Sequence, residues 1–261
     1  MMEFLLSHDW LNRPGPSYAF KIDHLLFIFI AMGIGIALAI LLRKCQRKTI
    51  GIVLVSLWAF GVAVEAFYYI FLYCLCINHA YGFTFNIETM LPFHSCSMFM
   101  FVFPVAFFTK NKYVKTAANN FLVFINMIMG FITLFVGCPQ PGYSTFSFFG
   151  AQTLIYHAII VIVPLIMVVT KYYDIKLGDI RYGLIAFGVL AIFMWIFDAI
   201  SGCDYFYFYD GHTFPVFKFI SENVHHLVWT LIVVFCYLFT GATVHFLIIG
   251  IKTLIHKKKE A

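Results

Sequence analysis

The sequence predicts an all-α, polytopic membrane protein with seven transmembrane helices, its N-terminus outside and its C-terminus in the cytoplasm. Three observations predict this: the apolar composition, seven long apolar runs and an uneven distribution of positive charge. Of the 261 residues, 62% are hydrophobic, 20% are aromatic and only 11% are charged, with a mean hydropathy of +0.92. Because soluble domains carry about 25% charged residues, this composition excludes a soluble globular protein.

Seven apolar runs are long enough to span a bilayer, since a transmembrane helix needs about 17 to 25 residues to cross roughly 30 Å of hydrocarbon. The predicted spans are 24–42, 50–77, 91–108, 116–138, 151–170, 182–200 and 224–250. The segment before them lacks the basic start of a cleavable signal peptide. The expected organisation is an extracytoplasmic N-terminal segment (1–23), a seven-helix transmembrane domain (24–250) and a basic cytoplasmic tail (251–261).

Lysine and arginine gather in every second connection between the spans and in the C-terminal tail. The exceptions among the 17 basic residues are Arg13, Lys21 and Lys218. Positive residues mark the cytoplasmic side of membrane proteins, and this pattern therefore predicts the orientation. The net charge of +5 is a topological signal that requires no nucleic acid. The expected partners are membrane phospholipids, whose anionic heads the basic loops can contact; the oligomeric state is left open.

A Leu-Pro-Phe-His-Ser-Cys sequence begins the third predicted span. Proline suits the first helical position, and we therefore expect Pro92 to open a helix that runs to Phe108. Cys96 would then lie just past the first turn, where the helix dipole favours a thiolate and hence a nucleophile. The alternative is that Cys96 only packs, because buried free cysteine is common.

Polar residues gather at one predicted depth, in the outer third of the membrane. These residues are His94, Cys96, Gln152, His157, Asp198, Ser201, His225 and His226. Independent structural hydrogen bonds would have no reason to gather in one leaflet, and the sequence therefore predicts a polar pocket open to the outer leaflet. Glu65 and Asn126 lie deeper and are expected to form its floor, hydrogen-bonded to each other. A charge at that depth costs at least about 2.5 kcal/mol unless it is paired or hydrated.

This pocket suggests thiol chemistry. Cys96 is the candidate nucleophile; its base would be His157, His225 or His226, oriented by Asp198, and His94 could donate to an oxyanion. The candidate substrate-binding residues are His225, Gln152, Asn126 and Glu65. We expect no cofactor. Cys138 and Cys203 are placed where an outer disulfide could form.

Several of these features resemble the YwaF-type bacterial integral membrane proteins, over most of spans two to six. The shared features are Glu65 in the preceding span, the Leu91 to Cys96 element, a fourth span ending at Pro139, the aromatic approach to His157 and a tyrosine-rich segment at Asp204-Tyr205. Asp204 replaces an expected asparagine, and residues 222–226 lack the expected proline- and tryptophan-rich approach. The resemblance implies a multi-pass protein of a bacterial plasma membrane.

Those bacterial proteins resemble, in turn, an animal multi-pass acyltransferase that moves fatty acyl groups between phospholipids using a cysteine. The resemblance implies that Cys96 is the nucleophile. Three alternatives remain: a proton or small-solute transporter using Glu65, His157 and Asp198, a metal site of His94, Cys96 and His157, and a non-catalytic structural membrane protein.

Overall fold

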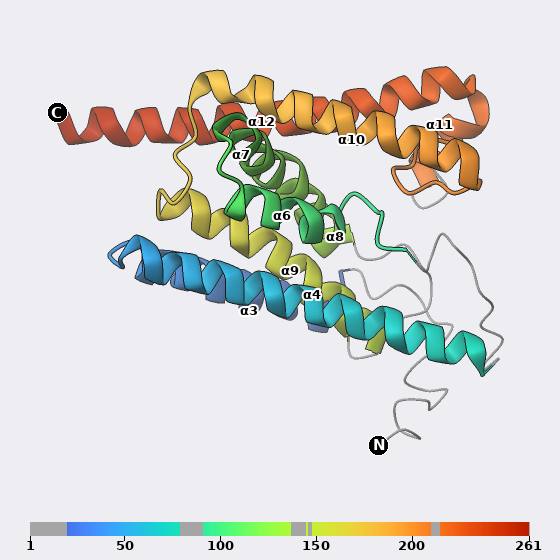
Figure 1. Cartoon of the computed structure of the whole chain (residues 1–261), viewed down its shortest axis with the longest axis horizontal. Coiled ribbons are helices and arrows are strands. Elements are labelled where there is room, and N and C mark those ends of the chain that lie inside the picture. Colours follow the sequence, from blue (N-terminus) through green and yellow to red (C-terminus); the bar gives the residue numbers. More distant parts are fainter. Residues whose placement is uncertain (1–19, 79–90, 137–144, 146–147, 210–214, 261) are drawn as a thin grey trace.

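The computed structural model describes residues 20–78, 91–136, 145, 148–209 and 215–260 (Figure 1). Over these residues the regular structure is helical, which confirms the predicted all-α class. The helices are α3 (Ile22–Leu42), α4 (Arg47–Ile77), α6 (Met98–Phe108), α7 (Lys112–Phe121), η2 (Leu122–Asn126), α8 (Met127–Val136), α9 (Phe148–Val169), η3 (Leu177–Asp179), α10 (Ile180–Ser201), α11 (Pro215–Asn223) and α12 (His226–Glu260).

Six helices in the described part of the chain are long and apolar enough to cross a membrane. They are α3, α4, the continuous rod of α7, η2 and α8, and then α9, α10 and α12. The chain is therefore a multi-pass membrane protein. The helix α12 continues to Glu260, so residues predicted as a separate tail extend the last helix instead.

The third predicted span differs from the expectation. The helix α6 has 11 residues, or about 16 Å at 1.5 Å per residue, which is roughly half the hydrocarbon thickness. The prediction that Pro92 opens it is wrong, because residues 91–97 form turns: Phe93 N donates to Leu91 O at 2.9 Å and Met98 N to His94 O at 3.2 Å. Cys96 therefore lies in a turn before α6 and not one turn inside it.

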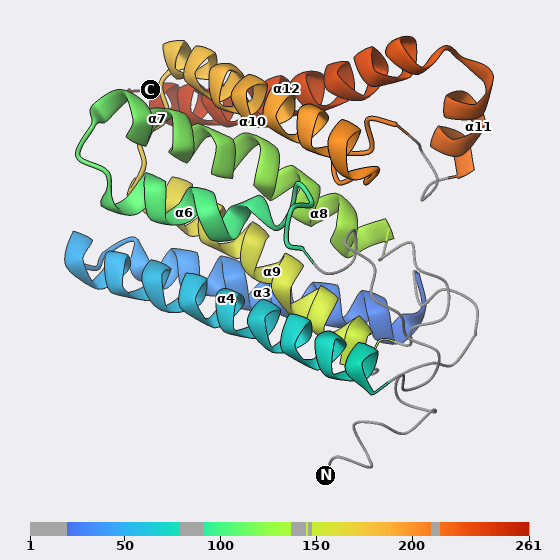
Figure 2. The ribbon, with the colours of Figure 1, turned by 45° about the vertical axis from the view of Figure 1, so that its right-hand side comes forward.

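Counting α7, η2 and α8 as one rod, successive helices from α3 to α10 run in opposite directions, and α12 runs opposite to α10, as Figures 1 and 2 both show. The connections 43–46, 109–111 and 170–176 consequently lie at one end of the molecule, together with the C-terminal end of α12. We call this the basic end, because the lysines and arginines of these connections and of the adjoining helix starts gather there. The side of the membrane that it faces stays a prediction.

The helix α9 lies at the centre, between the α3–α4 pair and α8 (Figure 2). Small residues on its neighbours allow close approach. A Cβ added at Gly35 would come within 2.6 Å of Ile162 Cγ1, and one added at Gly130 within 2.8 Å of Ile160 Cγ2. A second apolar cluster joins α10 and α12 to the segment after α10, in which Tyr205, Phe206 and Phe208 are buried.

Candidate active site

A π-helical segment places Asn126 opposite the turn that contains Cys96. All five residues of η2 are buried, and such segments are rare and often mark functional sites. The Asn126 Nδ2 atom donates to the carbonyl oxygens of Ser95, at 2.8 Å, and Cys96, at 3.3 Å. Within a membrane, irregular backbone needs such partners inside the protein. Asn126 thus supports the interruption that precedes α6.

The predicted hydrogen bond between Glu65 and Asn126 is wrong. The Asn126 amide nitrogen donates to the backbone, and its Oδ1 atom, fully buried, has no hydrogen-bond partner among the described residues. The reason is the broken start of α6, which presents carbonyl groups that a continuous helix would have used internally.

The Cys96 thiol lies in a polar environment between three helices. Its Sγ atom is 3.8 Å from Thr133 Oγ1 on α8, and the Thr133 hydroxyl itself donates to Met129 O at 2.9 Å. The threonine oxygen therefore offers its lone pairs to Cys96, so the thiol is the donor in this contact. Tyr156 on α9 and Tyr237 on α12 both lie close enough to Cys96 for electrostatic interaction.

Tyr156 is the residue of this site that sequence reasoning missed. It is 0% exposed, and its hydroxyl has no hydrogen-bond partner among the described residues. A buried hydroxyl without a partner is costly, and such atoms are uncommon in proteins. The available signal was its spacing of four residues from Gln152, which puts both on one face of α9. Gln152 is also buried and accepts a hydrogen bond from Thr153.

Glu65 continues this polar group onto α4. Its side chain is 5% exposed and interacts electrostatically with Tyr69 and Tyr156. The Tyr69 hydroxyl also interacts with the hydroxyl of Ser97, next to Cys96. By helix rise, Glu65 is about 27 Å from Arg47 along α4, and Tyr156 is about 20 Å from Val169 at the end of α9. The group therefore lies in the half of the molecule away from the basic end.

Two histidines adjoin this group. His94 Nδ1 is 3.3 Å from Tyr205 O, and His157 Nδ1 is 2.7 Å from Thr153 O. Because a carbonyl oxygen only accepts, each Nδ1 carries the hydrogen, and each neutral ring keeps its Nε2 lone pair. The two rings interact electrostatically. The backbone partners of Nδ1 thus identify Nε2 as the nitrogen that can take a proton in each of the two rings.

The remaining predicted residues form a second polar group on α10 and α12. Asp198 is 1% exposed and lies near Tyr209, whose ring is 4.5 Å from that of His226. Burial, followed by the charges of Asp198 and Asp204, raises the pKa of the Tyr209 hydroxyl above its usual value. His225 is exposed, and its Nδ1 atom accepts a hydrogen bond from Leu227 N at the start of α12.

No three His, Cys, Asp or Glu side chains in the described ranges are arranged to hold a metal ion. The alternative of a metal site at His94, Cys96 and His157 therefore has no structural support. Cys203 is buried, and its thiol donates to Ser201 O at 3.9 Å. Its predicted disulfide partner, Cys138, lies outside the described residues.

Comparison with known proteins gives one match. Residues 19–240 match the family model described as the TMEM164 family. The matched range covers more than half of the chain and includes Glu65, Cys96, Asn126 and Tyr156. No curated protein and no solved structure matches the chain. The resemblance to YwaF-type proteins, the bacterial origin and the plasma-membrane location stay predictions.

Proposed function

The chain belongs to the TMEM164 family, and we propose that it transfers fatty acyl groups between phospholipids through a thioester on Cys96. The observation that carries this proposal is the position of Cys96 in the turn before α6, which the hydrogen bonds from Asn126 hold in place. The thiol there lies near the Tyr156 hydroxyl, which has no hydrogen-bond partner in the described part of the chain, in the half of the molecule away from the basic end. A nucleophile beside a hydroxyl that can donate to a developing oxyanion suits acyl transfer.

In the first half of the reaction, His157 Nε2 takes the proton of the Cys96 thiol. The thiolate attacks the carbonyl carbon of a phospholipid ester, forming a C–S bond and leaving negative charge on the carbonyl oxygen. The Tyr156 hydroxyl, or His94, donates to that oxygen. The ester C–O bond then breaks, the leaving alkoxide takes the proton from His157, and a lysophospholipid departs.

In the second half, the hydroxyl group of another lysophospholipid gives its proton to His157. Its oxygen attacks the thioester carbonyl, the C–S bond breaks, and the Cys96 thiolate leaves and is protonated by the imidazolium. The acyl group has then moved from one phospholipid to another, with no net change in protons or electrons. Glu65, Gln152 and Asn126 bind the polar part of the lipids in this scheme. Asp198, His225 and His226, in the second polar group, would contact the lipid headgroup from the side of α10 and α12.

The test is acyl exchange by the purified protein in vesicles that contain a labelled phosphatidylcholine and an unlabelled lysophospholipid. Cys96→Ala should abolish exchange. The matched control is Cys74→Ala, because Cys74 is exposed on α4 and has no role in the reaction. Equal activity in the two variants would refute the assignment of Cys96.

The same vesicles, loaded with a pH-sensitive dye, test the transport alternative. We expect no proton flux above that of empty vesicles. A flux that is lost in Glu65→Gln but kept in Cys96→Ala would replace acyl transfer with transport.

A further inference from the structure

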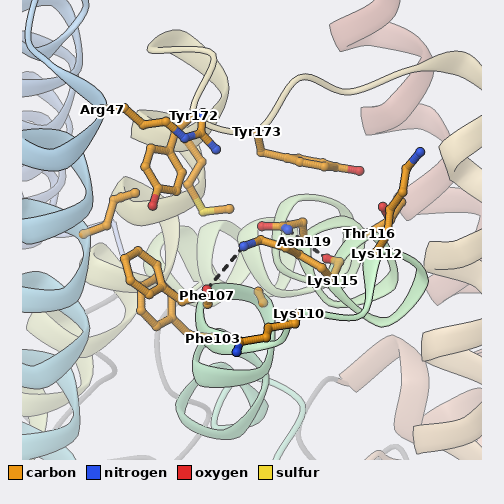
Figure 3. Close-up of a pocket in the computed structure, with 13 residues that line it drawn as sticks. Arg47, Phe103, Phe107, Lys110, Lys112, Lys115, Thr116, Asn119, Tyr172 and Tyr173 are labelled. Atoms are coloured by element: carbon orange, nitrogen blue, oxygen red, sulfur yellow. Dashed lines mark hydrogen bonds between the residues drawn. The ribbon is translucent and has the colours of Figure 1, made fainter.

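A separate pocket of about 260 Å³ lies at the basic end (Figure 3). Phe103, Ala106 and Phe107 line it from the C-terminal part of α6, whereas Cys96 precedes the start of that helix. Four positive side chains line the pocket: Arg47, Lys110, Lys112 and Lys115. They come from the start of α4, the connection after α6, and α7. No carboxylate lines it, and the ion pairs found among the described residues, Lys218–Glu222 and Lys252–Asp174, use none of the four. Their charge is therefore available to an anion.

Arg47 is held in place by a column of aromatic rings. Its guanidinium lies 4.3 Å from the centre of the Tyr172 ring, which stacks on Phe107 with centroids 6.0 Å apart and 7° between the planes. Phe107 stacks in turn on Phe103 at 5.6 Å. A guanidinium held by its face keeps its N–H edge free. The contact with Tyr172 thus orients the exposed Arg47 side chain so that it can donate to a planar or tetrahedral anion.

Lys115 is also fixed, because its Nζ atom donates to Phe107 O at 3.3 Å, as Figure 3 shows. Its backbone carbonyl accepts from Asn119 Nδ2 at 2.7 Å. Two groups from different helices are thus positioned before any ligand arrives. Such pre-organisation reduces the entropic cost of binding.

Two of the positive side chains lie at helix N-termini, where the helix dipole disfavours them. Arg47 and Lys112 begin α4 and α7, and neither helix has an acidic residue in its first turn. Helix N-termini carry positive partial charge, which disfavours cations there and favours anions. An anion in the pocket would relieve this repulsion at both helices. The preference of cytoplasmic loops for positive charge explains the number of lysines, but not a cavity or the stacked arginine.

Beside these charges, one wall of the pocket is apolar and consists of Leu54, Phe103, Ala106, Phe107 and Met167. A ligand that suits both walls has a phosphate group joined to an apolar part. The pocket also lies at the level where helices end and lipid headgroups begin.

We propose that this pocket binds the phosphate group of an anionic phospholipid from the leaflet at the basic end. Arg47 and Lys115 hold the phosphate oxygens, Lys110 and Lys112 add charge at the rim, and the glycerol backbone lies against the apolar wall. The site is distinct from that of the proposed acyl transfer, since Met98 and Phe107 are about 14 Å apart along the axis of α6 and Cys96 lies before the start of that helix. It does not depend on that function.

The test uses the full chain in nanodiscs of phosphatidylcholine with a small fraction of phosphatidylglycerol, with retained lipid counted by native mass spectrometry. Arg47→Gln should weaken phosphatidylglycerol retention about tenfold, as expected for one charge-assisted hydrogen bond. Lys112→Gln, which removes a charge at the rim, should weaken it by a smaller factor of about three to five. The control is Arg181→Gln, since Arg181 lies at the same end and also covers a tyrosine ring, at 4.9 Å, but does not line the pocket. It should leave retention unchanged.

Equal retention in all variants, or an equal loss in Arg181→Gln, would overturn the proposal. A second arm adds inorganic phosphate or pyrophosphate at millimolar concentration. Failure of these ions to displace the lipid supports a lipid site, and full displacement would assign the pocket to a soluble phosphate compound and overturn the lipid assignment. Because Lys112 is exposed, Lys112→Gln should fold normally. It therefore tests the proposal even if Arg47→Gln fails to fold.

Discussion

Replacing Tyr156 by phenylalanine removes one oxygen atom from a fully buried side chain. That hydroxyl has no hydrogen-bond partner among the described residues, and leaving such a group unpaired costs about 1–3 kcal/mol. Tyr156→Phe should therefore raise the free energy of unfolding by about 1–2 kcal/mol. If the hydroxyl donates to the oxyanion, the same change should lower acyl exchange by about 10²- to 10³-fold. A gain in stability with a loss of activity is the expected result.

The assay is thermal unfolding of the purified protein in one detergent, together with acyl exchange in vesicles. The control is Tyr237→Phe, because the Tyr237 hydroxyl interacts with Ser95, and its removal should lower stability by about 1 kcal/mol. If Tyr156→Phe is less stable than the parent protein, the hydroxyl is engaged in the folded state and the reasoning fails. If exchange is unchanged, Tyr156 has no part in the reaction.

Gly35→Ala should destabilise the protein by about 1–3 kcal/mol in thermal unfolding, because the added Cβ meets α9 at 2.6 Å. Gly33→Ala, where nothing lies within 4 Å, should stabilise it by up to about 1 kcal/mol; the opposite order would contradict the packing. Asn126→Ala should cost about 1–3 kcal/mol by leaving the Ser95 carbonyl without its donor, whereas Cys96 O keeps its hydrogen bond from Phe99 N. It should also speed alkylation of the Cys96 thiol; an unchanged rate would argue against the support of that turn by Asn126. Lys252 lowers the pKa of Asp174 through a 2.6 Å hydrogen bond. Lys252→Gln should therefore cost less than about 1 kcal/mol at neutral pH, because the pair is partly exposed. That difference should disappear as the pH falls through the lowered pKa, below about pH 4, and a difference that persists there would exclude the ion pair as its cause.

The sequence was sufficient to predict most of the helices. Apolar runs of spanning length predicted α3, α4, α9, α10 and α12. The predicted helix boundaries lie within a few residues of the observed ones, except at the C-terminal end of α12. The prediction succeeds because a membrane helix must satisfy its backbone internally and needs a minimum length. The alternation of basic connections predicted that they share one end of the molecule, and the ribbon brings them there (Figure 1).

The start of α6 could not be predicted in the same way. Pro92 suits a first helical position, but whether residues 91–97 continue as a helix depends on what lies beside them. Asn126, far away in the sequence, donates to the carbonyl groups of Ser95 and Cys96 and so stabilises the turn. Local propensity contains no information about that partner.

The candidate site was partly predictable. A cysteine, a glutamate and histidines within the apolar runs of a hydrophobic chain stand out, because ionisable groups are rare in membranes. Tyr156 does not stand out, since tyrosine is common in apolar helices of a chain with 20% aromatic residues. Its importance depends on an unpaired hydroxyl, which is a property of the packed structure alone. The π-helical segment before Asn126 likewise has no signature in the sequence.

The account depends most on Cys96 as the acyl carrier. The most direct measurement is mass spectrometry of the full-length protein after brief exposure to phosphatidylcholine that carries a labelled acyl chain, without any acceptor. We predict a mass increase of one acyl group, located on the peptide that contains Cys96 and removed by adding lysophospholipid. A label on another cysteine, or complete acyl exchange with no adduct on Cys96, would contradict the account.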